Sequence, residues 1–106
     1  MANFVKAIPI SSINSAAFTG DYDVLSVGLD NACSILRIVN DSNRDVTVSY
    51  DGVTDHDYVV AGSNLTINAQ TNSRIAGDIA QFRKGLPVHV KAAAGTGFVY
   101  LAGYHT

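Results

Sequence analysis

The sequence has no glutamate and no tryptophan, and only one methionine, one cysteine, two prolines and two glutamines among its 106 residues. Glutamate, methionine and glutamine favour helices, so their scarcity argues against a helical domain. A single cysteine cannot form an internal disulfide. No apolar run approaches the ~20 residues of a membrane-spanning helix, so we expect no membrane partner.

Charged residues are scarce as well, at 15% of the chain, with 7 lysines and arginines against 9 aspartates. The net charge of −2 leaves no basic excess to attract nucleic acid, which we do not expect as a partner. Residues 1–7 have neither a basic region nor a long apolar stretch, so we also expect no signal peptide.

Residues that favour strands are abundant instead. The chain holds twelve valines, eight isoleucines and seven threonines, whose β-branched side chains suit a pleated sheet. Aspartate, asparagine and glycine cluster between the apolar runs, where turns need them. With 47% hydrophobic residues and a length that fits one domain, the composition predicts a single all-β domain.

Eight short strands are expected from the apolar runs and the turn signals between them. They cover residues 4–10, 21–27, 33–40, 46–50, 56–60, 65–69, 86–91 and 98–101. The run 33–40 is apolar enough to predict a central strand buried on both faces, and Asp51 with Gly52 predicts a tight hairpin turn. Residues 71–84 are expected to form a long loop with one helical turn. The pattern predicts an antiparallel β-sandwich or jelly roll.

The first twenty residues differ from the rest because they are rich in alanine, serine, isoleucine and phenylalanine and almost free of charge. We expect residues 1–20 to form an apolar N-terminal arm or an edge strand, and residues 21–106 to form the sandwich domain. Pro9 fits an edge, since proline has no N–H to donate to a neighbouring strand. An arm would pack on a neighbouring subunit. The side chains expected at that contact are Phe4, Val5, Ile8, Ile10, Ile13 and Phe18.

The densest group of titratable residues is the segment 51–57, with three aspartates and His56. Hard oxygen ligands for calcium, or an Asp and His set for zinc, would be the functional interpretation. The spacing does not match a calcium loop, and Asp51 is already explained by the turn. We therefore expect Asp55 and Asp57 on a solvated strand surface, with no metal and no other cofactor.

Nothing else in the sequence indicates catalysis, and we expect no catalytic residue and no enzymatic activity. Cys33 heads an apolar run without a neighbouring cation, which predicts a small core residue. His89 alternates with Val88 and Val90, so we expect it on the surface. No serine stands in the Gly-x-Ser-x-Gly frame of a nucleophile elbow.

Tyrosines are the remaining candidates for surface recognition. Aromatic side chains on one sheet face could stack on a sugar, or they could be cross-strand neighbours at the rim of the core. Tyr50 and Tyr58 flank the expected turn, where such a pair would meet. The candidates are Tyr50, Tyr58, Tyr100 and Tyr104.

Three pieces of the chain, spread over residues 33–101, resemble small virion proteins of tailed bacteriophages. They are ILRIVN (35–40) with VTVSYDG (46–52), YVVAGS (58–63) with TN (71–72), and GLPVHVK (85–91) with GTGFVY (95–100). The resemblance implies a β-sandwich or jelly-roll protein built into the particle, either a capsid decoration (cement) protein or a head–tail joining protein. It brings no catalytic residues with it.

That resemblance implies a virion location after assembly in the host cytoplasm, with the major capsid protein or the portal and neck proteins as partners. We expect a homo-oligomer, a trimer on a capsid or a ring at the neck, whose many copies gain avidity together. Deleting residues 1–20 is then expected to keep the fold and abolish assembly. Two alternatives from other classes stay open: a carbohydrate-binding or adhesin-like module, and a metal-dependent domain around Asp55, His56 and Asp57.

Overall fold

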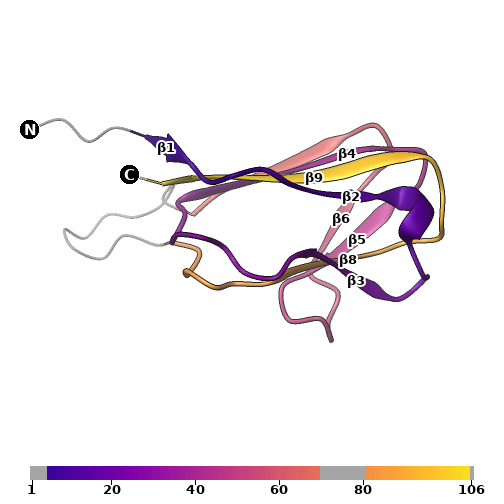
Figure 1. The fold of residues 1–106 in the computed structure, drawn as a ribbon, viewed down its shortest axis with the longest axis horizontal. Helices are drawn as coiled ribbons and strands as arrows, with labels where there is room; N and C mark the ends of the chain where they lie inside the picture. Colours follow the sequence, from indigo (N-terminus) through magenta and orange to yellow (C-terminus); the bar gives the residue numbers. More distant parts are fainter. Residues whose placement is uncertain (1–4, 70–80, 106) are drawn as a thin grey trace, which may run out of the picture.

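The protein is an antiparallel β-sandwich, as the sequence predicts. The computed structural model describes residues 5–69 and 81–105, in which nine strands and one short 3-10 helix form two sheets. Figure 1 shows the two layers from the side, with the longest strand in one layer and the third and eighth strands in the other.

Sheet A, as we call the first layer, is five-stranded. Its long central strands are β4 and β9, which pair antiparallel over the whole length of β4. The fifth member, β2, continues the edge that β1 begins, because both strands pair with β9. The bounds are β1 Lys6–Ala7, β2 Ser11–Asn14, β4 Ile35–Ser42, β7 Asn64–Asn68 and β9 Gly97–His105.

Sheet B, the second layer, is four-stranded in the order β3-β8-β5-β6. All of its pairings are antiparallel. The 3-10 helix η1 (Ser15–Ala17) leads the chain from sheet A into sheet B. The bounds are β3 Tyr22–Ser26, β5 Val46–Ser49, β6 Asp57–Val59 and β8 Val88–Lys91.

The core lies between the sheets and is built by alternation, since successive side chains of a strand point to opposite faces. In β4, Leu36 and Ile38 are buried while Arg37 is exposed. The expectation that residues 33–40 are buried on both faces is therefore wrong, because sheet A is covered on one side only. The buried apolar residues are Ile8, Phe18, Leu25, Leu29, Cys33, Leu36, Ile38, Val46, Val48, Val59, Val88, Val90, Val99 and Leu101.

Asn40 joins the two sheets through its fully buried side chain. It extends from β4, and its Nδ2 donates hydrogen bonds to the Arg44 carbonyl at 2.7 Å and to the Val59 carbonyl of β6 at 3.0 Å. Its Oδ1 accepts from the Ser42 N–H at 3.2 Å. A polar residue in the core thus satisfies backbone groups that would otherwise lose their partners on burial.

The N-terminal edge runs along β9 with one interruption. Between β1 and β2, the Ile8 N–H donates to the Gly103 carbonyl at 3.0 Å, so the segment stays against β9. Pro9 follows and has no N–H to continue the ladder. Of the strand predicted over residues 4–10, the described structure thus has only β1 (Lys6–Ala7), and a second strand, β2, follows at Ser11–Asn14.

Two other predicted features of the chain differ or fall outside the described residues. β5 and β6 are antiparallel partners, but residues 50–56 connect them, so Asp51 and Gly52 do not form a two-residue hairpin. Most of the loop expected over residues 71–84 lies outside the described residues. Phe82 is described and forms an isolated bridge with Cys33.

Candidate functional site

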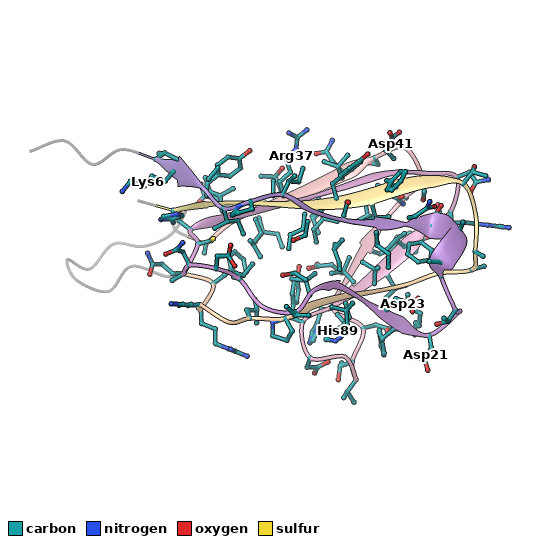
Figure 2. The ribbon with its side chains drawn as sticks, viewed as in Figure 1. Lys6, Asp21, Asp23, Arg37, Asp41 and His89 are labelled. Carbon is teal, nitrogen blue, oxygen red and sulfur yellow. The ribbon has the colours of Figure 1, made fainter. Side chains whose placement is uncertain are left out.

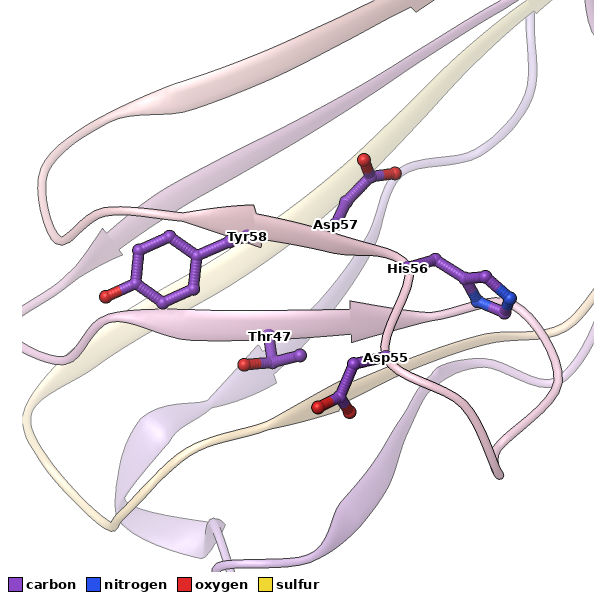
Figure 3. A pocket seen from close by; sticks show the side chains of 5 residues that line it. All are labelled: Thr47, Asp55, His56, Asp57 and Tyr58. Carbon is purple, nitrogen blue, oxygen red and sulfur yellow. The ribbon is translucent and has the colours of Figure 1, made fainter.

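An open hollow lies on sheet B where β5, β6 and the loop 50–56 meet. Its lining residues are Thr47, Asp55, His56, Asp57 and Tyr58. Figure 3 shows Thr47 and Tyr58 on neighbouring strands, with Asp55 and His56 in the adjoining loop. Thr47 and Tyr58 are directly opposite one another in the β5–β6 register, which explains why their side chains share the outer face.

Beside this hollow, Lys91 and Asp55 form an ion pair that Tyr22 also contacts. Lys91 of β8 lies opposite both Tyr22 and Thr47, and its Nζ is 3.0 Å from an Asp55 carboxylate oxygen. The Tyr22 hydroxyl donates to Asp55, and Lys91 Nζ is 4.8 Å from the centre of the Tyr22 ring. These contacts lower the pKa of Asp55 and raise the pKa of Tyr22 and of Lys91. The group therefore keeps its charged pair across the neutral range.

Asp51 shapes the loop beside the hollow. Its Oδ1 accepts hydrogen bonds from the backbone N–H groups of Val53 and Thr54, each at 2.8 Å, and from the Ser49 hydroxyl at 2.9 Å. The two backbone bonds are the main reason why the pKa of Asp51 lies well below its usual range.

Tyr50 holds the loop 50–56 to β6. Its hydroxyl donates to Asp57 at 2.6 Å, and its backbone N–H donates to His56 Nδ1 at 3.0 Å. The Tyr50 and His56 rings stack with centroids 5.4 Å apart. Burial, followed by the bond to Asp57, raises the pKa of Tyr50 far above its usual value. The tyrosine remains a neutral donor at any physiological pH.

Tyr58 is fixed in the same way at the other end of the hollow. Its hydroxyl donates to Asp45 at 2.7 Å, and Asp45 also accepts the Ala61 N–H at 2.9 Å. The bond from Ala61, then that from Tyr58, lowers the pKa of Asp45, and the same contact raises the pKa of Tyr58. The expected pairing of Tyr50 with Tyr58 is wrong, since Tyr58 lies opposite Thr47 and Tyr50 stacks on His56.

The carboxylates in and beside the hollow are paired with tyrosine hydroxyls. Asp45, Asp55 and Asp57 each accept a tyrosine hydroxyl. Within residues 5–69 and 81–105, no three histidine, cysteine or acidic side chains are grouped so that they could hold a metal ion. The carboxylates here organise the loop and the strand edge.

His89 is half-buried, whereas the sequence predicts a surface residue. It lies beneath the loop 50–56, and a Cβ added to Gly52 would be 3.2 Å from its ring. Gly52 has a φ of +75°, which glycine adopts without strain. In the described part of the chain, His89 Nδ1 is buried and has no hydrogen-bond partner. The prediction failed because alternation gives the face of a strand and says nothing of a loop folding over it.

The outer face of sheet A carries a second candidate surface. Tyr100 and Tyr104 both point outward from β9, and Phe98 stacks on Tyr100 with centroids 6.0 Å apart. Figure 2 shows Arg37 and Asp41 projecting from the same sheet, away from the core. The cross-strand pairs on this face are Ile35 with Tyr104, Arg37 with Ala102, Val39 with Tyr100, and Asp41 with Phe98.

The four tyrosines singled out from the sequence thus divide between the sheets, with Tyr100 and Tyr104 on sheet A and Tyr50 and Tyr58 on sheet B. Sequence reasoning missed Arg37 and Asp41 on the face of Tyr100. Their spacing of four residues on one strand was the signal, because residues two or four apart share a face.

The apolar residues expected at a subunit contact have different surroundings. Ile8 and Phe18 are buried in the core of this chain, and Ile13 packs against that core. Val5 and Ile10 are 69% and 65% exposed. Phe4 lies outside the described residues.

Cys33 is a fully buried core residue, as its apolar surroundings in the sequence predict. Burial raises the pKa of its thiol. The thiolate is the reactive form of cysteine, so the native environment of Cys33 suppresses its reactivity.

Comparison with known proteins identifies no family. No protein-family model matches the chain, and no curated protein matches it either. Among solved structures, the chain is similar over 96% of its length to the Dit protein of SPP1, described as a paradigm of the hub adsorption apparatus in phages that infect Gram-positive bacteria. The identity is 10%, the TM-score is 0.45, and the match spans 49% of that protein. At this distance the likeness assigns neither a family nor a function to the chain.

In residues 5–69 and 81–105, no helix has the length and apolar character required to cross a bilayer.

Proposed function

We propose that this chain is a non-enzymatic structural protein of a tailed-bacteriophage particle, and that it acts as a capsid decoration (cement) protein. Head–tail joining in the neck of the particle is the second role that fits the same features. The proposal combines the resemblance of residues 33–101 to such virion proteins with one structural observation, the exposed apolar N-terminal edge. Its partners are then the major capsid protein or the portal and neck proteins.

The N-terminal edge supports the proposal because it exposes both the backbone groups of an edge strand and apolar side chains. β1 and β2 form an outer edge of sheet A, and such an edge presents backbone groups to which a neighbour can add a strand. Val5 and Ile10 expose most of their apolar surface on the same segment. Many copies on a lattice gain avidity from contacts of this modest size, without any catalytic site.

Particles purified from a host that carries the gene test the virion assignment. We expect mass spectrometry to find the chain in particles that have been separated from free protein by density centrifugation. A copy number in proportion to that of the major capsid protein supports decoration. A copy number that corresponds to the subunits of a single ring supports a role in the neck. Absence of the chain from the particles would overturn the proposal.

Paired substitutions test the edge itself. We expect Val5→Asp with Ile10→Asp to reduce incorporation at least tenfold, because each charge would be buried without a partner at the contact. The matched control is Val27→Asp with Val53→Asp, whose side chains are 88% and 79% exposed in loops. Deletion of residues 1–20 is unsuitable, because it would also remove Ile8 and Phe18 from the core. Equal incorporation of the two paired variants would contradict the role of the edge.

A carbohydrate-binding module is the alternative from another class. Tyr58, at 58% exposure, is the most accessible of its candidate tyrosines. Absence from particles, together with a glycan-dependent change in tyrosine fluorescence that Tyr58→Ala abolishes, would favour this alternative.

A further inference from the structure

We propose that the outer face of sheet A binds a second copy of this chain, face to face, with β4 of one copy lying antiparallel over β4 of the other. This face is the surface formed by the outward side chains of the two central strands. They are Ile35, Arg37, Val39 and Asp41 of β4, and Phe98, Tyr100, Ala102 and Tyr104 of β9.

The outer face has the anatomy of a protein interface, with an apolar centre and a polar rim. Val39 and Tyr100 are half-buried neighbours at its middle, and Phe98 is 41% exposed beside them. The rim is uncharged and exposed on both sides. It consists of Asn64, Thr66 and Asn68 on β7 and of Ser12 and Asn14 on β2.

The two charges on this face indicate that its partner is an identical chain. Arg37 and Asp41 are both exposed, and in the described part of the chain neither forms an ion pair or a side-chain hydrogen bond. Four residues of strand separate their Cα atoms by about 13 Å, too far for them to pair with each other. They stand symmetrically on either side of Val39. A surface with one charge of each sign about a central apolar residue is complementary to itself.

A two-fold axis between the sheets, perpendicular to β4 and passing over Val39, satisfies both charges at once. Rotation about this axis reverses the strand, so Arg37 of one copy faces the partner's Asp41, and Asp41 faces the partner's Arg37. In a two-fold interface every contact occurs twice in this reciprocal way. An axis parallel to the strands would instead set β4 over β9 and leave both charges against Ala102 and Phe98, which is costly.

The same axis also matches side-chain sizes. Ala102 lies beside Arg37 and Phe98 lies beside Asp41, so the rotation sets the small Ala102 of each copy opposite the partner's Phe98. Tyr100 meets the partner's Tyr100 next to the central pair of Val39 residues. Large side chains opposite small ones allow two sheets to interdigitate at their usual separation.

The available area sets the expected strength. Four strands at ~4.8 Å and eight residues at ~3.3 Å give a face of about 19 by 26 Å, or about 1,000 Å² from two copies. That area is at the lower limit for specific interfaces, so we expect a reversible dimer rather than a permanent one. The dimer is independent of the proposed virion role. A chain that is found in particles but does not dimerise would overturn the dimer and leave the virion role standing.

Charge reversal tests this arrangement by sedimentation equilibrium of the full chain at concentrations from about 1 µM to 1 mM. We expect the wild type to dimerise within that range, and Arg37→Asp and Asp41→Arg each to weaken self-association at least tenfold, because like charges then face each other. Mixing the two variants restores every pair, since one copy then carries two carboxylates and the other two guanidinium groups. The 1:1 mixture is therefore expected to form a heterodimer of wild-type strength.

Matched charge changes away from this face serve as controls. Asp30→Arg and Lys84→Asp alter exposed loop residues and should leave the dimer unchanged. The mixture also guards against misfolding, because two misfolded variants would not restore a dimer when combined. A monomeric wild type at 1 mM, equal effects of face and loop variants, or a mixture that stays monomeric would each overturn the proposal.

Discussion

At the scale of single residues, the carboxylate of Asp51 takes the place of the backbone hydrogen bonds of a tight hairpin turn. Its three accepted hydrogen bonds close the loop 50–56 where a tight hairpin would have used backbone bonds alone. The same loop covers His89, so the side chain of Asp51 also determines what is exposed on the outer face of sheet B. Charge-assisted bonds of this kind are stronger than neutral ones.

Asp51 should therefore make stability depend on pH. Its folded pKa lies below the unfolded value of about 3.9, so its contribution is present above that pH and is lost as the pH falls through the folded pKa. We expect urea unfolding of the wild type to show falling stability below about pH 4. Asp51→Asn keeps an acceptor oxygen and loses the charge, so it should be less stable than the wild type at pH 7 and approach it at acidic pH.

The control for this experiment is Asp30→Asn, an exposed carboxylate without a hydrogen bond among the described residues. It should follow the wild type at every pH. Asp45 and Asp55 also have lowered pKa values and share in the acid loss, so Asp51→Asn should reduce the pH dependence without removing it. Parallel curves for Asp51→Asn and the wild type would contradict the role assigned to the charge.

At the scale of elements, the strands that could be predicted are those in which alternation and turn chemistry agree. Val46 and Val48 alternate with polar residues, and a polar loop follows this segment. β5 forms over the segment, with both valines fully buried. The class of the fold follows from such segments, because each strand offers one apolar face and two sheets must cover those faces.

The features that could not be predicted depend on contacts between distant segments. The side chain of Asn40 reaches β6. β4 continues to Ser42, beyond the predicted end at residue 40, because Asp41 and Ser42 pair with Phe98 and Gly97 of β9. Burial of His89 requires a loop that folds over it. The outer face of sheet A requires the pairing of β4 with β9, whose partners are about sixty residues apart in the sequence. Local patterns carry no information on such pairings.

Gly97 begins β9, and its replacement should test the β4–β9 pairing. Its φ is +94°, and a Cβ there would contact the Asp41 carbonyl oxygen and lie 2.9 Å from Ser42 Cα. We expect Gly97→Ala to lower the free energy of unfolding by about 2–4 kcal/mol, from backbone strain and overpacking together. Urea denaturation measures the change.

Gly20 supplies the matched comparison, since its φ is +86° and nothing lies within 4 Å of an added Cβ. Gly20→Ala should therefore show the backbone strain alone, about 1 kcal/mol. If the two alanine variants were equally stable, close packing at the start of β9 would not be the cause.

At the scale of the whole molecule, the chain passes back and forth between the two sheets. Sheet A takes β1, β2, β4, β7 and β9, and sheet B takes β3, β5, β6 and β8. Neither sheet is built from a continuous part of the chain, so neither can separate without unravelling the other. Pairings between distant strands also make folding slow compared with that of a helical domain.

We therefore expect a single cooperative unfolding transition. Far-UV circular dichroism reports the strands, and tyrosine fluorescence reports side chains in both sheets, so their midpoints in urea should coincide. Gly97→Ala, whose change is in sheet A, should shift both midpoints equally. Separate midpoints for the two signals would mean that one sheet survives without the other. Refolding is expected in milliseconds to seconds.

The buried position of Cys33 gives a way to follow both the opening of the native molecule and its assembly. The chain contains one thiol, which the folded molecule shields from water and holds in its unreactive form. A thiol reagent can modify it only after the structure opens, so the rate of labelling measures how often the native molecule opens. Binding to a second copy or to a particle would slow that rate, and the unaltered protein would thus report on its own assembly.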